Sequence, residues 1–153
     1  MTSPFDVVTF DHGPPMANRF MLAPLTNMQS HEDGTLSDDE ERWLVKRAEG
    51  GFGLTMTCAS HVMATGQGFP GQLGCFSDDH VDGLRQLASG ITAAGSVSSL
   101  QLHHAGIRAF AGVSDKVGPS SDDKTGARAL EAEEIASVIK AFVAAARRAE
   151  RAG

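Results

Sequence analysis

Three residues of the sequence could together bind a flat polar ring. Thr26 ends the apolar run 19–26, Ala59 lies in the run 52–62, and Gln101 lies in the run 96–106. The primary amide of Gln101 has two donors and an acceptor, so it can pair with a ring edge that carries a carbonyl and an N–H, such as the pyrimidine side of a flavin. Ala59 is small enough to let a ring approach the backbone. From the residues alone, a glutamine that is hydrogen-bonded locally remains the alternative interpretation.

The histidine pair His103-His104 raises the question of a metal site. Adjacent residues of a regular strand point to opposite faces, so this pair cannot chelate one ion from a strand. The two cysteines, Cys58 and Cys75, are far apart in the sequence and form no zinc motif. We therefore expect no metal, a structural hydrogen-bonding role for His104, and a place for His103 in the wall of a substrate pocket. Cys75 is expected to be a small buried residue rather than a reactive thiol.

The three apolar runs are predicted to be strands that lie under helices. The run 19–26 ends soon after Pro24, and proline belongs at a strand terminus because it cannot donate to a sheet. The runs 52–62 and 96–106 are short and nearly continuous in apolar, serine and threonine residues, as in strands of a parallel sheet. Alternation along the second strand predicts that Thr55, Thr57 and Ala59 share one face. In the third strand, Gln101 and His103 are predicted to lie opposite Leu100 and Leu102.

Helices are predicted between and after these strands. Ser37 and Glu40 have the spacing of a capping box at the start of a helix that Gly50 and Gly51 end. A second helix starts at Ser77 and ends at Gly95, and a third covers about 131–152, after a long polar loop over 107–130. The apolar face of the second helix is predicted to comprise Val81, Leu84, Leu87, Ala88 and Ile91. That of the third is predicted to comprise Ile135, Val138, Ile139, Phe142, Val143 and Ala146.

This alternation of strands and helices predicts an α/β fold with a parallel sheet. Crossovers between parallel strands are right-handed, so all three strands should end at the same edge of the sheet. Ligand sites of such folds gather at the carboxyl ends of the strands. We therefore expect Thr26, Ala59 and Gln101 to lie close together.

Composition excludes several classes of function. The net charge is −6, with 19 acidic against 13 basic residues, and no basic cluster is present, so we expect no nucleic-acid partner. No apolar run approaches the roughly 20 residues of a membrane span, and the N-terminus lacks the basic region of a signal peptide. Two cysteines are too few for a disulfide framework, which favours the cytoplasm.

Several motifs resemble the old yellow enzyme family of NADH:flavin oxidoreductases, over essentially residues 5–153. The first is Asn18-Arg19 followed by Ala23-Pro24-Leu25-Thr26, and the last is Gln101-Leu102-His103-His104-Ala105-Gly106. Between and after them lie Asp33-Gly34-Thr35, Gly66-Gln67-Gly68-Phe69-Pro70-Gly71, Ser77-Asp78-Asp79 and Glu133-Glu134-Ile135. Each motif alone is weak, but together they are specific.

The resemblance implies a fold, a cofactor and roles for these residues. The fold would be a TIM (β/α)8 barrel that binds FMN, of which this chain would be about the first three βα units. By position, Pro24, Leu25 and Thr26 would lie against the isoalloxazine, and Ala59 and Gln101 would contact its pyrimidine side. The reaction would pass hydride from NAD(P)H to FMN and then to an activated alkene or a quinone-like small molecule.

The same resemblance implies that residues 1–153 are an N-terminal part, truncated before the fourth strand. In the family, later strands supply the substrate-binding pair, the proton-donating tyrosine and the phosphate site, and this chain contains no tyrosine. A complete barrel needs roughly 250 residues. Three units would leave open sheet edges, so we expect association with a complementing C-terminal half or with a second copy. The alternative function is a non-catalytic fragment that acts only through such association.

Overall fold

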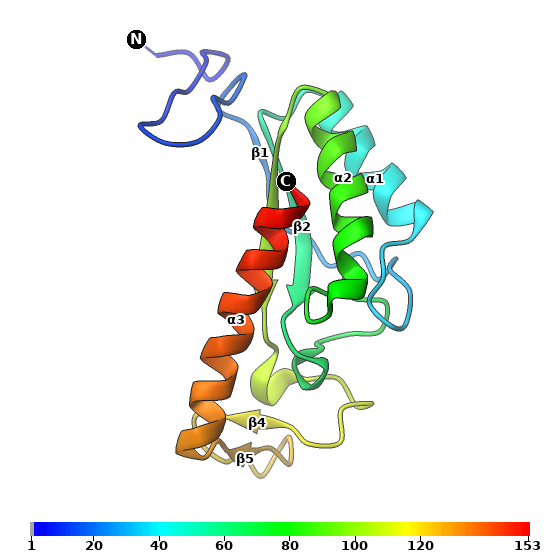
Figure 1. Ribbon diagram of the computed structural model, residues 1–153, viewed down its shortest axis with the longest axis vertical. Helices are drawn as coiled ribbons and strands as arrows, with labels where there is room; N and C mark the ends of the chain where they lie inside the picture. Colours follow the sequence, from blue (N-terminus) through cyan, green and yellow to red (C-terminus); the bar gives the residue numbers. More distant parts are fainter. Residues whose placement is uncertain (1) are drawn as a thin grey trace.

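Three parallel strands alternate with three helices in the computed structural model, which describes residues 2–153. Strands β1 (Met21–Leu22), β2 (Leu54–His61) and β3 (Val97–His103) form one sheet in that order, with β1 and β3 at its edges. Helices α1 (Asp38–Glu49), α2 (Val81–Ala93) and α3 (Ala132–Ala152) each follow one strand (Figure 1). The predicted alternation and the parallel sheet are both confirmed.

The first strand is shorter than the predicted run 19–26. Only Met21 and Leu22 pair with β2, opposite Leu54 and Thr55. Pro24 follows two residues later and has no N–H to donate, so the ladder cannot continue through it. Residues 23–26 therefore leave β1 outside regular secondary structure.

Strand β2 contains a bulge that the sequence analysis did not predict. Met56 is opposite Ser99, but Ala59 is opposite Gln101, so β2 has one more residue than β3 between these pairs. The Thr57 hydroxyl is hydrogen-bonded to the backbone at this bulge. Its Oγ1 accepts from the N–H of Gln101 at 3.2 Å and donates to the carbonyl of Cys58 at 2.8 Å. The extra residue reverses the alternation beyond it. The prediction that Ala59 shares a face with Thr55 and Thr57 is therefore wrong.

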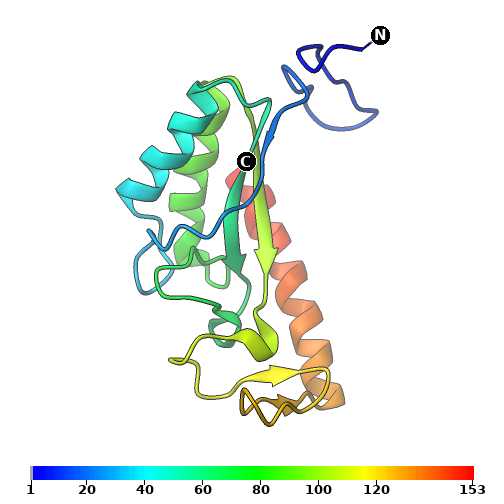
Figure 2. The same ribbon diagram turned by 180° about the vertical axis from the view of Figure 1, so that it is seen from behind.

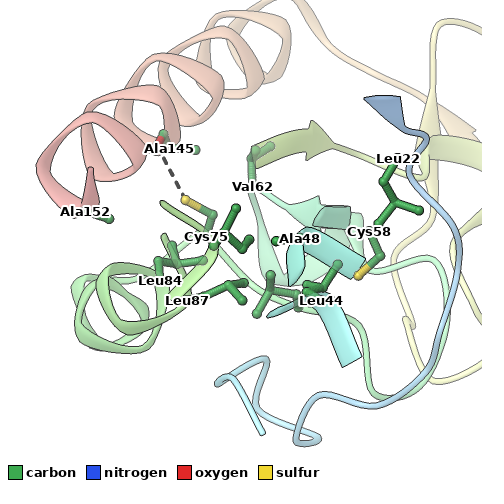
Figure 3. Packing of buried hydrophobic residues seen from close by; sticks show 12 residues of the cluster. Leu22, Leu44, Ala48, Cys58, Val62, Cys75, Leu84, Leu87, Ala145 and Ala152 are labelled. Atoms are coloured by element: carbon green, nitrogen blue, oxygen red, sulfur yellow. Dashed lines mark hydrogen bonds between the residues drawn. The ribbon is translucent and has the colours of Figure 1, made fainter. Parts of the chain in front are cut away.

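All three helices pack on one face of the sheet. Their apolar side chains meet Leu22 of β1 and Cys58 of β2 in one core, with Leu44, Leu87 and Ile91 almost without exposure to solvent (Figure 3). The predicted face of α2 is confirmed, since all its five members are buried. None of the helices within residues 2–153 is long and apolar enough to cross a membrane.

The start of α1 agrees only partly with the predicted capping box. The Ser37 hydroxyl accepts from the backbone N–H of Glu40 at 3.2 Å, as expected for an N-cap. The Glu40 side chain, however, turns into the core and is fully buried. There its carboxylate accepts hydrogen bonds from the hydroxyl of Ser30 and, at 2.9 Å, from the thiol of Cys58. Glu40 thus ties the loop before α1 to β2 instead of capping the helix.

The apolar surface of α3 is only partly used inside the chain. Ala145 and Ala152 are buried and Phe142 is partly buried against the core. Ile135, Ile139 and Val143, which were predicted to lie on the packed face, are 48%, 59% and 48% exposed. One turn separates each from the next, so they form an apolar stripe along the outside of the helix.

Short elements occupy the loops at the carboxyl ends of the strands. The 3₁₀ turns are η1 (Ala64–Gly66), η2 (Asp78–His80) and η3 (Gly106–Arg108). The segment predicted as a plain loop, 107–130, contains two paired strands, β4 (Val117–Gly118) and β5 (Arg128–Ala129). Arg128 donates to the carboxylates of Asp115 and Glu134, which lowers the pKa of Glu134 to about 2 and joins this small sheet to the start of α3.

The bulge predicts that Thr57→Val destabilises the chain by about 1–3 kcal/mol, because the valine leaves the Gln101 N–H without its acceptor. The matched control is Thr92→Val on the exposed surface of α2, which should change the free energy of unfolding by less than about 0.5 kcal/mol. Urea unfolding followed by circular dichroism measures both. Equal effects of the two substitutions would contradict the role given to the Thr57 hydroxyl.

Candidate functional site

The candidate site lies on the face of the sheet that the helices do not cover. Leu100 and Leu102 of β3 pack against the helix-side core, so Gln101 and His103 point to the opposite face, as predicted. Cys58 faces the core and Ala59 is opposite Gln101 in register, so Ala59 belongs to the same open face. Figure 2 shows this side, with the strands in front of α3.

Gln101 and Ala59 are brought side by side by the sheet register. Both are half-buried. The backbone N–H of Gln101 is bonded to Thr57, but its carboxamide has no hydrogen-bond partner within residues 2–153. The alternative interpretation, a locally bonded glutamine, is therefore wrong for this side chain. Its amide is available to pair with the polar edge of a bound molecule.

The segment after β1 is not part of the sheet, although its last residue was expected to lie beside Ala59 and Gln101. This segment contains Pro24, Leu25 and Thr26. Pairing of β1 with β2 ends at Leu22, so Thr26 is not held in the register that joins Ala59 to Gln101. Pro24 is half-buried, Thr26 is exposed, and Leu25 is 56% exposed. This segment thus adds solvent-exposed apolar surface after the first strand.

The loop after β2 folds back over the strand ends and carries a residue that the sequence analysis missed. The backbone of His61 accepts from Cys75 at 2.9 Å and donates to Leu73 at 3.0 Å, which holds the loop against β2. This brings Gln72, which is fully buried, onto the end of the strand. Its Nε2 donates to the carbonyl of Ala59 at 2.8 Å. The sequence of a glycine-rich loop has no periodic pattern, so nothing in it could have identified Gln72 as a buried residue.

The histidines differ in their surroundings. His103 is half-buried, and burial lowers its pKa. His104 accepts from the backbone N–H of Gly106 at 3.1 Å, which confirms its predicted structural role. His61 is 2% exposed, its Nδ1 contacts the carbonyl of Met63 at 2.9 Å, and its Nε2 has no partner among the described residues. Burial lowers the pKa of His61 as well.

Neither cysteine has the surroundings of a reactive thiol. Cys58 and Cys75 are both buried and unbridged. Burial raises the pKa of Cys75 to about 11, and burial together with the charge of Glu40 raises the pKa of Cys58 still further. The predicted packing role of Cys75 is confirmed, since it lies in the core with its thiol 3.4 Å from the carbonyl of Ala145 (Figure 3). Within residues 2–153, no group of three or more histidine, cysteine or acidic side chains could hold a metal ion.

The arrangement suits a flat ring with one polar edge. A carboxamide without a hydrogen-bond partner among residues 2–153, a small side chain and a half-buried imidazole lie next to one another on the open face. A cavity of about 260 Å³ between β3, α2 and α3 lies on the helix side, where Leu84, Leu87 and Ala149 line it. It offers mainly apolar surface and does not include Ala59 or Gln101.

Comparisons with a family model, with related sequences and with solved structures all point to the same family. The model of the NADH:flavin oxidoreductase / NADH oxidase family matches residues 5–153. The chain is 38% identical over 97% of its length to a probable NADH-dependent flavin oxidoreductase, YqiG, of Bacillus subtilis, and 36% identical over 89% to an NADPH dehydrogenase of Bacillus velezensis. In each case it spans 41% of the relative. The solved old yellow enzyme homologue of Zymomonas mobilis matches 99% of the chain with a TM-score of 0.90 and 28% identity, over 46% of its own length.

The buried histidines predict that the chain loses stability as the pH falls from about 7 to 5. The ordinary histidine pKa is 6.5 and that of folded His61 is lower, so the unfolded chain binds more protons in this range. His61→Asn can keep a donor to Met63 but cannot titrate. It should therefore reduce the slope of unfolding free energy against pH, by up to about 1.4 kcal/mol per pH unit.

Urea unfolding at several pH values measures this slope. His12→Asn, at an exposed position, is the matched control and should leave the slope as in the wild type. A His61→Asn variant with the wild-type slope would show that His61 does not contribute to the loss of stability at low pH.

Proposed function

The chain belongs to the NADH:flavin oxidoreductase / NADH oxidase family, whose members use FMN with NAD(P)H as reductant, and we propose that it supplies the flavin-contacting N-terminal part of such an enzyme. The observation that carries the proposal is the Gln101 carboxamide, which has no hydrogen-bond partner in the described part of the chain and lies beside Ala59 on the open face of the sheet. By position, the family resemblance would give both of these residues a contact with the ring.

The residues present fit an isoalloxazine along one edge. The Gln101 amide would donate to and accept from the carbonyl and N–H groups of the pyrimidine side, and Ala59 would leave room for the ring. Pro24, Leu25 and Thr26 would approach the ring from the end of β1, with the hydroxyl of Thr26 as a further hydrogen-bonding group. His103 would line the substrate side of the pocket. Bound FMN would accept hydride from NAD(P)H and pass it to an activated alkene or quinone-like molecule.

We propose that this chain forms the first three βα units of an eight-unit barrel. It spans 41% of the relatives named above, and the solved neighbours are barrels of this kind. On this proposal, the later units supply the phosphate site and the groups that bind and protonate the substrate. FMN held only by residues 24–26, Ala59 and Gln101, with its phosphate in water, should bind weakly.

A second candidate function is association without catalysis. Ile135, Ile139 and Val143 expose an apolar stripe on α3, and β3 is an edge strand within the described residues. Such surfaces favour pairing with a complementing half or with a second copy. For either function the cytoplasm is the proposed location, because both buried cysteines are unpaired.

The proposal predicts a difference between the chain alone and the completed barrel. The chain alone should not bind FMN with micromolar affinity in a titration of flavin fluorescence. Co-expression with the C-terminal part of the Bacillus subtilis relative should give a complex that retains FMN absorbance. In that complex, Gln101→Met should weaken FMN binding about tenfold or more, because the hydrogen bonds to the ring edge are lost.

Gln86→Met is the matched control, because Gln86 is exposed on α2 and its carboxamide donates to the carboxylate of Glu41, away from the open face. It should leave FMN affinity unchanged. Micromolar binding by the chain alone would contradict the partial-barrel proposal. A colourless complex with the C-terminal part would favour association without catalysis, and equal FMN affinities of the two variants would contradict the role of Gln101.

A further inference from the structure

Backbone groups fix the orientation of the Gln72 carboxamide. Its Oε1 accepts from the N–H of Gly68 at 2.6 Å, and its Nε2 donates to the carbonyl of Ala59 at 2.8 Å. A flipped amide would set NH₂ against an N–H and oxygen against a carbonyl, so both contacts would become repulsive. Gln72 is fully buried, and water cannot relieve such a mismatch.

The fixed amide determines the proton position on His103. The Nε2 atom of Gln72 lies 3.3 Å from Nδ1 of His103. An amide nitrogen donates but does not accept, and its second hydrogen remains after the bond to Ala59. Nδ1 of His103 must therefore be the acceptor, which leaves the ring proton on Nε2. Burial lowers the pKa of His103 and so favours the neutral ring, which is the form that carries a single ring proton.

The Nε2–H group of His103 is then available on the open face. His103 is two residues beyond Gln101 on the same side of β3, and the amide of Gln72 occupies its Nδ1 side. No residue among 2–153 is hydrogen-bonded to Nε2 of His103. A ligand beside Gln101 would therefore meet a neutral N–H donor at this position rather than an acceptor or a cation.

We propose that Gln72 is a positioning residue that holds His103 as the neutral Nε2–H tautomer, so that the pocket presents a hydrogen-bond donor to an acceptor oxygen such as a substrate carbonyl. The assignment of that oxygen to a substrate rests on the function proposed above. The tautomer itself is a property of the chain and needs no cofactor.

Nitrogen-15 NMR of the histidine rings in the full chain tests the proposal, with the His103 signals assigned by their loss in His103→Gln. The expected wild-type result is a single neutral tautomer at pH 7.5, protonated at Nε2. Gln72→Met keeps the length of the side chain but removes the amide, and should give a mixture of tautomers. Gln72→Glu should favour a proton on Nδ1 and raise the pKa of His103, because a carboxylate accepts where the amide donated.

The matched control is Gln67→Met in the same loop, since the Gln67 carboxamide donates to the carbonyl of Phe69 and has no hydrogen bond to a histidine within residues 2–153. It should leave the His103 spectrum unchanged. A wild-type spectrum with the proton on Nδ1 would overturn the proposal even if the Gln72 variants do not fold. An unchanged His103 tautomer in folded Gln72→Met would also overturn it. Neither outcome involves FMN, so failure here is distinct from failure of the proposed function.

Discussion

The parallel ladder between β2 and β3, with one extra residue in β2, is the constraint on which the candidate site depends. Without the bulge, alternation would turn Ala59 toward the helices and Cys58 toward the open face. With it, Cys58 reaches the buried carboxylate of Glu40, and Ala59 stands beside Gln101. The Thr57 hydroxyl satisfies the N–H that the irregularity would leave unpaired. The bulge thus places Cys58 in the core on one face of the sheet and Ala59 in the candidate site on the other.

The two faces of the sheet are covered unequally, which supports the proposal that the chain is part of a larger assembly. Three helices bury one face of the sheet, while the other carries the half-buried Gln101 of the candidate site, and α3 exposes Ile135, Ile139 and Val143. Burial of apolar surface stabilises a fold by about 25 cal/mol per Å², so further βα units packed on these surfaces would add stability as well as site residues. The same physical argument supports pairing with a second copy.

The sequence predicted the elements that local chemistry determines. Ser37 capped α1, the apolar spacing of α2 matched its buried face, and Gln101 and His103 shared the open face. Features that depend on tertiary contacts were missed. The bulge at Thr57, the inward turn of Glu40 and the buried amide of Gln72 each depend on a partner distant in the sequence. For α3, the apolar pattern was wider than the face that this chain can cover.

On the proposed function, Ala59 and Gln101 form the wall that faces the pyrimidine edge of FMN. A crystal structure of the chain in complex with a complementing C-terminal part, grown with FMN, tests it most directly. We expect the Gln101 carboxamide within hydrogen-bonding distance of that edge, with Ala59 beside the ring. FMN bound elsewhere, for example in the cavity between β3, α2 and α3, would contradict it.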